Sequence, residues 1–141
     1  ACMLAAGLNT LIHYEVLSAL SDHLNTLHVP KRSKLLVVIL ATLVAHAVEM
    51  AVYGVAIYGL IAGLGIGGLT GSGGFSLETC MYFSAETYTS LGFGDISPLG
   101  PIRMIAGFEA LHGLLMIGWS SSFLFISMER FWAIRRAADH R

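Results

Sequence analysis

Two glycines that alternate with apolar residues form the segment of this sequence with the clearest potential for chemistry. Residues 90–95 read SLGFGD, which places glycine at Gly92 and Gly94. Glycine adopts left-handed backbone angles that other residues avoid, and such angles at alternate positions turn successive carbonyl groups the same way. A row of carbonyl oxygens can replace the water shell of K⁺. The segment therefore predicts a filter for a dehydrated cation.

The expected filter runs from Ser90 to Gly94. We expect the conducted K⁺ to bind at the level of Ser90, Leu91, Gly92 and Phe93. The side chains of Leu91 and Phe93 should point away from the axis and pack against the preceding helix, while the Ser90 hydroxyl completes the innermost site. Passive conduction by carbonyl rings requires no catalytic residue and no organic cofactor, so we assign neither and expect no enzyme.

The filter is positioned by a short helix, which the sequence predicts at residues 77–89. This segment is too short to span a membrane and is bounded by glycines and a proline. Irregular backbone at membrane depth is tolerated only where it is buried in protein or lines a watery path. We therefore expect a re-entrant pore helix whose C-terminal end, with its partial negative charge, favours a cation.

Composition and hydropathy indicate a membrane protein. The 141 residues are 55% hydrophobic and only 12% charged, against about 25% charged in a typical soluble domain. Two apolar runs, 35–62 and 102–128, are long enough to cross a bilayer. The predicted pore domain, 31–130, comprises an outer helix at 34–62, a flexible extracellular linker at 63–76, the pore helix and filter at 77–96, and an inner helix at 101–128.

Basic residues predict the topology. Seven of the eight lie in two clusters, which are Lys31, Arg32 and Lys34, and then Arg130, Arg135, Arg136 and Arg141. The positive-inside rule places both clusters in the cytoplasm, so an even number of crossings separates them. The basic tail at 131–141 either binds anionic lipid headgroups or only fixes topology, and we expect no nucleic-acid partner.

The N-terminal segment, residues 1–30, is ambiguous between two placements. Residues 1–20 are apolar enough to form a third span, which would put the N-terminus outside the cell. The alternative is an amphipathic helix lying in the cytoplasmic interface. We favour the third span because the apolar part reaches spanning length.

The pore-helix and filter sequence YFSAETYTSLGFGD, from Tyr82 to Asp95, resembles the potassium channel family, whose filter reads TVGYGD. The resemblance extends over residues 35–130 and is to the small bacterial type with two transmembrane helices. It implies an all-α pore-loop channel with two or three transmembrane helices, a re-entrant pore helix, a selectivity filter and fourfold assembly as a homotetramer. Ser90 replaces the usual threonine and keeps the oxygen but loses a methyl group. The matching residues are Ser84, Glu86, Thr89, Gly92, Gly94 and Asp95.

The resemblance also implies roles for residues around the filter. Glu86 and Asp95 would share a proton or a water behind the filter, although Glu86 could instead cap backbone amides. Thr89 and Tyr82 would support the filter. Gly113 matches the gating-hinge glycine, against the alternative that it only lets helices approach closely. Helical spacing from Gly113 predicts a cavity-lining face with these members: Ile117, Ser121 and Phe125.

Six ionisable residues inside the predicted spans are not explained by the family motif. At a rise of about 1.5 Å per residue, they share one layer near the middle of a ~30 Å hydrocarbon core. We expect this layer to couple the outer helices to the pore helix, with Glu109 as the central partner. It could be a hydrogen-bond network, a pH sensor or a zinc site. The six are His13, Glu15, His46, Glu49, Glu109 and His112.

The sequence thus predicts a K⁺-selective channel subunit in the plasma membrane, a multi-pass protein with its C-terminus in the cytoplasm. A weakly selective monovalent cation channel is the nearest alternative, because Ser90 loosens one site. A membrane metal-binding protein or metal transporter, suggested by the buried His and Glu residues, is an alternative of another class. A regulatory subunit that does not conduct is a further one.

Overall fold

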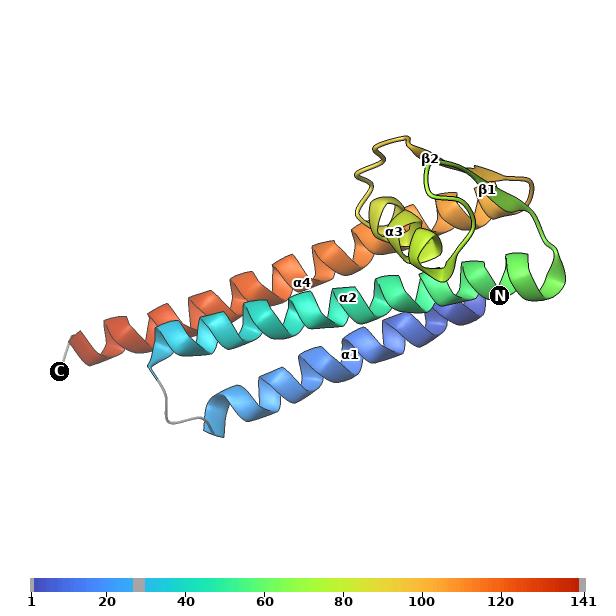
Figure 1. Ribbon diagram of the computed structural model, residues 1–141. Coiled ribbons are helices and arrows are strands. Elements are labelled where there is room, and N and C mark those ends of the chain that lie inside the picture. The colour runs from blue at the N-terminus through green and yellow to red at the C-terminus, as the bar shows by residue number, and fades with distance from the viewer. Residues whose placement is uncertain (1, 27–29, 140–141) are drawn as a thin grey trace.

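Three long helices run side by side, and a short helix with a two-stranded sheet covers one end of them (Figure 1). The computed structural model describes the backbone of residues 2–26 and 30–139 and the side chains of residues 2–24, 30 and 33–129. The N-terminus lies at the covered end and the C-terminus at the opposite end. The elements are α1 (Cys2–Thr26), α2 (Lys31–Leu64), β1 (Gly68–Gly71), α3 (Leu77–Tyr88), β2 (Ile96–Leu99) and α4 (Ile102–Asp139).

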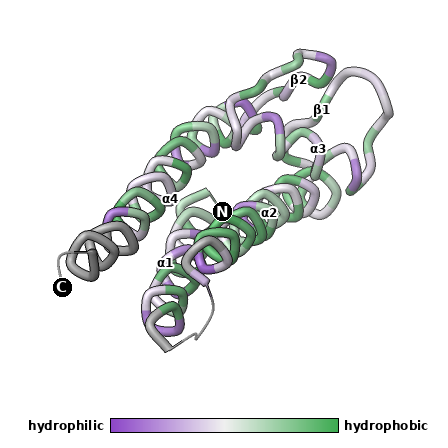
Figure 2. The backbone as a smooth tube through the Cα atoms, turned by 90° about the vertical axis from the view of Figure 1, so that its left-hand side faces the viewer, coloured by the Kyte–Doolittle hydropathy of each residue, from purple (hydrophilic) through white to green (hydrophobic). Residues whose placement is uncertain are grey.

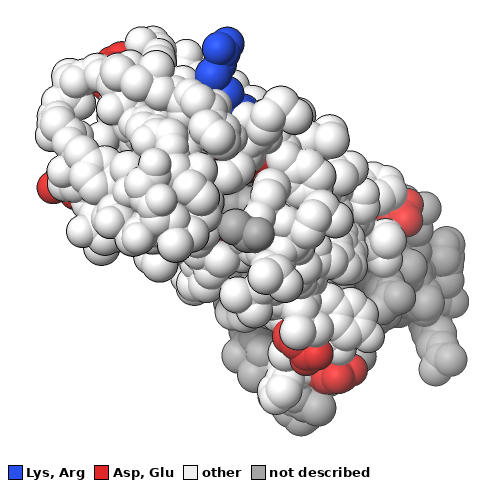
Figure 3. All heavy atoms as spheres, turned by 90° about the vertical axis from the view of Figure 1, so that its right-hand side faces the viewer, with Lys and Arg blue, Asp and Glu red and all other residues white. Residues whose placement is uncertain are grey.

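The surface of the long helices is suited to lipid. Three stretches, Cys2–Leu24, Ser33–Leu64 and Ile102–Glu129, are long and apolar enough to cross a membrane. Apolar residues follow each other along all three (Figure 2), and the face in Figure 3 carries few charged side chains. Leucine, valine and other large apolar side chains remain exposed along α2 and α4. The predicted fold class, an all-α pore-loop membrane protein, is confirmed, and α1 is a third candidate span.

The packing of α1 favours the spanning placement over the interfacial one. Asn9 of α1 donates a hydrogen bond from Nδ2 to the carbonyl oxygen of Glu49 at 3.1 Å. Near the other end of α1, the Lys34 ammonium group donates to the carbonyl oxygen of Leu24 at 2.6 Å. These contacts make α1 antiparallel to α2 over most of its length. A helix that follows a spanning helix in this way crosses the same layer of the membrane.

The short helix α3 corresponds to the predicted pore helix and is one residue shorter than expected. Ser76 caps its N-terminus, where Ser76 Oγ accepts a hydrogen bond from the Thr79 amide at 3.0 Å. Its buried face packs into an apolar core shared by α2, α3, β2 and α4. Gly54 of α2 permits close contact, because a Cβ there would lie 2.7 Å from the sulfur of Met81.

The predicted linker is not a featureless flexible segment. Strand β1, inside the linker, pairs antiparallel with β2, which follows the filter, and Leu69 is opposite Pro98. Glycine-rich composition pointed to flexibility, but here glycine permits close backbone contact. Gly71 has φ 132°, and a Cβ on it would collide with the carbonyl group of Asp95. The flexible-linker interpretation is therefore wrong at residues 68–71.

The last helix is longer than predicted. The inner helix was expected to end at residue 128, whereas α4 continues to Asp139. The basic residues predicted to bind lipid or to fix topology, those of residues 130–141 together with Lys31 and Arg32, have side chains outside the described residues.

Candidate functional site

The candidate filter begins where α3 ends. The amide of Leu91 donates to the carbonyl oxygen of Glu86 at 2.9 Å, and the amide of Gly92 donates to the same oxygen at 3.4 Å. The chain therefore turns back over the last turn of α3 and then leaves it. This arrangement fixes the start of the filter segment to the C-terminal end of the short helix.

Left-handed backbone angles alternate along the filter segment. Gly92 has φ 56° and Gly94 has φ 81°, as the spacing of the two glycines predicted. The alternation extends one step further back than predicted, because Ser90 has φ 57°. Ser90 is the one residue other than glycine with positive φ among those that the structure describes. A regular i, i+2 repeat counted backward from the glycines could have identified this third position.

The two apolar side chains of the filter do not pack as predicted within one chain. They were expected to lie against the pore helix, but Leu91 is 59% exposed and Phe93 is 67% exposed. Within this chain, both side chains are therefore left largely uncovered.

Glu86 and Asp95 have different partners in the described part of the chain, where no direct hydrogen bond joins them. Glu86 Oε1 accepts from the amide of Phe93 at 3.3 Å, which is the amide-capping alternative. Asp95 Oδ1 accepts from the hydroxyl of Tyr82 at 3.4 Å. Partial desolvation, together with the carboxyl groups of Glu86 and Asp95, raises the pKa of Tyr82 to about 12. The Tyr82 hydroxyl therefore remains a hydrogen-bond donor at neutral pH.

Thr89, the other residue predicted to support the filter, donates from Oγ1 to the carbonyl oxygen of Ala85 at 2.7 Å.

Replacing Glu86 by alanine is expected to change the steady open fraction of the channel without abolishing its ion selectivity. The reason is that Glu86 accepts a hydrogen bond from the Phe93 amide behind the filter, and a typical hydrogen bond contributes about 0.5–1.5 kcal/mol. Single-channel recording in planar bilayers measures the open fraction. Glu86→Gln is the matched variant, because its amide oxygen can still accept from Phe93.

The two variants separate the two roles of Glu86. If amide capping is the role, Glu86→Gln stays close to the parent. If a proton shared with Asp95 is the role, Glu86→Gln behaves like Glu86→Ala. Unaltered opening in Glu86→Ala would remove Glu86 from gating altogether.

The filter segment is held at its Asp95 end by β1 and the residue after it, a contact that the sequence did not predict. The amide of Ser72 donates to the carbonyl oxygen of Asp95 at 3.2 Å, and Gly71 lies against the same carbonyl group. The linker before α3 and the end of the filter therefore form one unit. Thr70 is the one residue of high β propensity in β1, and this signal was too weak to predict the strand.

Gly113 lies against the end of α3. A Cβ on Gly113 would collide with the carbonyl group and ring of Tyr88, the last residue of that helix. This geometry supports the close-approach interpretation of Gly113. It gives no indication of a hinge, since the residue lies inside the regular helix α4.

The predicted cavity-lining face of α4 divides into two parts. Gly113 is buried, and Ile117 packs against a core cluster that includes Tyr53 and Tyr88. Ser121 and Phe125 are exposed, Phe125 by 62%. Positions four apart drift by about 40° per step on a helix, so twelve residues turn the face by about a third of a circle. Gly113 and Ile117 thus contact other helices of the same chain, and the cavity-lining role of this face stays a prediction.

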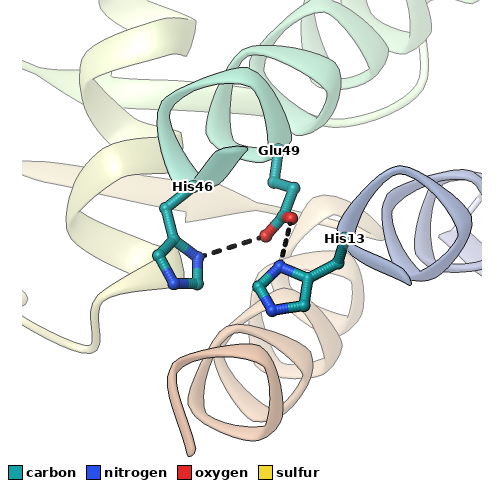
Figure 4. A group of neighbouring side chains, drawn as sticks. All are labelled: His13, His46 and Glu49. Atoms are coloured by element: carbon teal, nitrogen blue, oxygen red, sulfur yellow. Dashed lines mark hydrogen bonds and ion pairs between the residues drawn. The ribbon is translucent and has the colours of Figure 1, made fainter. Parts of the chain in front are cut away.

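A buried polar cluster around Glu49 joins all four helices, and Figure 4 shows its members from α1 and α2. Glu49 Oε1 lies 2.7 Å from Nδ1 of His13, and Glu49 Oε2 lies 3.2 Å from Nδ1 of His46. The Tyr88 hydroxyl donates to Glu49 Oε2. Ser120 Oγ contacts Nε2 of His46 at 3.0 Å and Nε2 of His13 at 3.1 Å. The central carboxylate is therefore that of Glu49, although the sequence predicted Glu109 for this role.

Glu109 and His112 belong to a second set of contacts. Glu109 Oε1 accepts from the hydroxyl of Ser84 on α3 at 2.5 Å, so Glu109 does link α4 to the pore helix. His112 Nε2 lies 3.1 Å from Oγ1 of Thr10 on α1. Glu15 is exposed and lies outside both sets. Residues two apart lie on opposite sides of a helix, so His13 points inward and Glu15 outward. The expectation of a six-membered layer is wrong for Glu15.

The comparison with known families defines the class of this protein. Residues 34–130 match the sequence model of a family described as ion channel. The match covers more than half of the chain, which therefore belongs to this family and confirms the resemblance to two-transmembrane potassium channels.

A similarity to one curated protein adds a shorter match. Over 40 residues, 28% of this chain, the sequence is 48% identical to Protein LctB of Bacillus caldotenax. The aligned part covers 30% of that protein. No solved structure matches the chain.

Proposed function

We propose that this chain is one subunit of a K⁺-selective channel that conducts K⁺ passively through residues 90–94. The observation that carries the proposal is the alternation of left-handed angles at Ser90, Gly92 and Gly94. Such an alternation turns consecutive carbonyl groups toward one axis, where they replace the hydration shell of K⁺. The C-terminal end of α3 lies at the base of this segment and adds favourable negative potential.

Fourfold assembly supplies what the single chain lacks. One chain holds one pore loop, and a ring of carbonyls around an ion needs several such loops, four in the family's pattern. Closed rotational symmetry around the pore meets this need. The exposed side chains of Leu91 and Phe93 support the same conclusion, because neighbouring subunits would cover them.

The arrangement of the chain ends supports the proposed topology. The N-terminus lies at the end that carries the filter, and the C-terminus lies at the other end. With the basic clusters in the cytoplasm, the filter and the N-terminus face outward in the plasma membrane. Anionic lipid at the basic tail is part of this proposal.

A weakly selective cation channel is the second candidate, and Ser90 is the observation that favours it. Threonine, the usual residue at this position, is stiffer at χ1 than serine because it is β-branched. A β-branched residue is also strongly disfavoured at positive φ, so serine suits φ 57° better. The innermost site is then less rigid than in the family pattern, which would lower discrimination against Na⁺.

Ion flux from proteoliposomes tests the proposal. In matched K⁺ and Na⁺ gradients we expect flux of K⁺ to exceed that of Na⁺ severalfold and to be blocked by Ba²⁺. Equal fluxes would replace K⁺ selectivity with the weakly selective alternative. The absence of monovalent flux in a correctly assembled protein would contradict channel function and favour a regulatory subunit.

A further inference from the structure

We propose that His13, His46 and Glu49 form a binding site for a divalent transition metal of the Zn²⁺ type, which fastens α1 to α2 behind the pore helix. One ligand atom from each residue lies within 4.8 Å of the others. Imidazole nitrogen and carboxylate oxygen are ligands that zinc prefers. The proposal does not depend on ion conduction.

The positions of the three side chains follow from two helices. His46 and Glu49 are three residues apart on α2 and therefore share one face of that helix. His13 reaches them from α1, whose backbone is held close by the hydrogen bond from Asn9 to the carbonyl oxygen of Glu49. Figure 4 shows both imidazole rings turned toward the carboxylate. The site thus consists of preplaced ligands from two packed elements.

Proton counting shows that the ring of contacts around Glu49 is short of protons. A closed ring of four contacts runs through Glu49, His13, Ser120 and His46. Two neutral imidazoles and one hydroxyl supply at most three protons to this ring, and an ionised carboxylate supplies none. At least one contact therefore lacks a proton of its own, and the Tyr88 hydroxyl, 3.1 Å from His46 Nδ1, can supply one only at the contact between His46 and Glu49. A bound cation would satisfy the lone pairs of both imidazoles and of the carboxylate together.

One tautomer choice makes the site complete for a metal. If both histidines donate from Nε2, the two lone pairs of Ser120 Oγ accept both protons. Both Nδ1 lone pairs then face the carboxylate of Glu49, to which the Tyr88 hydroxyl also donates. Metal-binding histidines characteristically donate their second N–H to a fixed acceptor, which sets their orientation. Ser120 holds this position for both rings.

The site is largely closed to water. The side chains of His13 and Glu49 are fully buried, and that of His46 is 14% exposed. The ring of Trp119 lies 5.3 Å from that of His13 between centroids. The Glu49 carboxylate therefore depends on its contacts with His13, His46 and Tyr88 in place of water. Tyr88 ends the pore helix, so a metal at Glu49 would act directly on the base of the filter.

Metal content of the purified assembly tests this proposal. The channel, produced without a polyhistidine tag, is stripped with chelator, dialysed against Zn²⁺ and analysed by mass spectrometry of the metal. We expect one Zn²⁺ per chain and a rise in unfolding temperature on adding Zn²⁺. His13→Asn keeps a polar side chain that can form a hydrogen bond with Glu49 but removes the imidazole ligand. It should weaken Zn²⁺ binding beyond the ~10–100-fold that losing a ligand's hydrogen-bond partner costs.

The matched control is His112→Asn, which changes another buried histidine that links α4 to α1. This control should retain one Zn²⁺ per chain. If His13→Asn does not assemble, His46→Asn removes the ligand that is partly exposed and serves the same purpose. Equal Zn²⁺ content in the parent and the ligand variant, or none in the parent, would overturn the site. The contact that lacks a proton would then hold an added proton in a hydrogen-bonded network.

Discussion

Gly92→Ala is expected to lower the ratio of K⁺ to Na⁺ flux by at least about tenfold, which corresponds to ~1.4 kcal/mol. Gly92 has φ 56°, and no neighbouring atom lies within 4 Å of an added Cβ, so the substitution acts through the backbone alone. A residue other than glycine at such an angle costs about 1–3 kcal/mol. In the proposed fourfold ring each subunit would bear this cost, and we expect the carbonyl groups to turn away from the axis to relieve it.

The control for this experiment is Gly65→Ala. Gly65 ends α2 with φ 64°, and it too has no atom within 4 Å of an added Cβ. The two substitutions therefore impose similar strain, one inside the filter and one outside it. Gly65→Ala should lower the unfolding temperature yet keep the flux ratio of the parent. A parental ratio in assembled Gly92→Ala would show that residues 90–94 do not select the ion.

Gly113→Ala is expected to destabilise the protein by about 1–3 kcal/mol, the usual cost of forcing extra volume into a packed site. The added Cβ would collide with backbone atoms of Tyr88, which cannot rotate aside as a flexible side chain could. Because Tyr88 ends α3, the displacement should also lower K⁺ flux. Thermal unfolding in detergent and flux from proteoliposomes measure the two effects.

The same helix supplies a control for Gly113→Ala. Gly118 has no atom within 4 Å of an added Cβ, so Gly118→Ala should be neutral or stabilise α4 by up to ~1 kcal/mol. If Gly113 is instead a hinge, Gly113→Ala should fold and assemble like the parent and change only the open fraction of the channel. That outcome would contradict the close-contact interpretation.

The elements of the fold were largely predictable because their signals are local. Apolar runs of spanning length predicted α2 and α4, and the glycine and proline residues around α3 bounded it to within one residue. The strands β1 and β2 were missed because each is only four residues long and the pairing joins residues 25 to 31 positions apart. Backbone pairing of that kind leaves no periodic pattern in the sequence.

The site was predictable in composition but not in its connections. The filter glycines follow from backbone geometry, and depth arithmetic correctly brought His13, His46 and Glu49 to one level. Depth along a helix does not give direction around it, which is why Glu15 was wrongly included. It also cannot rank carboxylates at similar depth, so Glu109 was expected at the centre that Glu49 occupies.

The placement of α1 has a consequence for how the chain is inserted into the membrane during synthesis. Of the three candidate spans α1 is the least apolar, and it carries Thr10 and His13 toward partners on α4 that follow 102 and 107 residues later. Until α4 has been made, these polar groups face lipid without those partners, which is unfavourable. We therefore expect α1 to reach its final depth late, after α4 has entered the bilayer. Although α1 precedes α2 and α4 in the sequence, it is then the last of the three to be fixed in place.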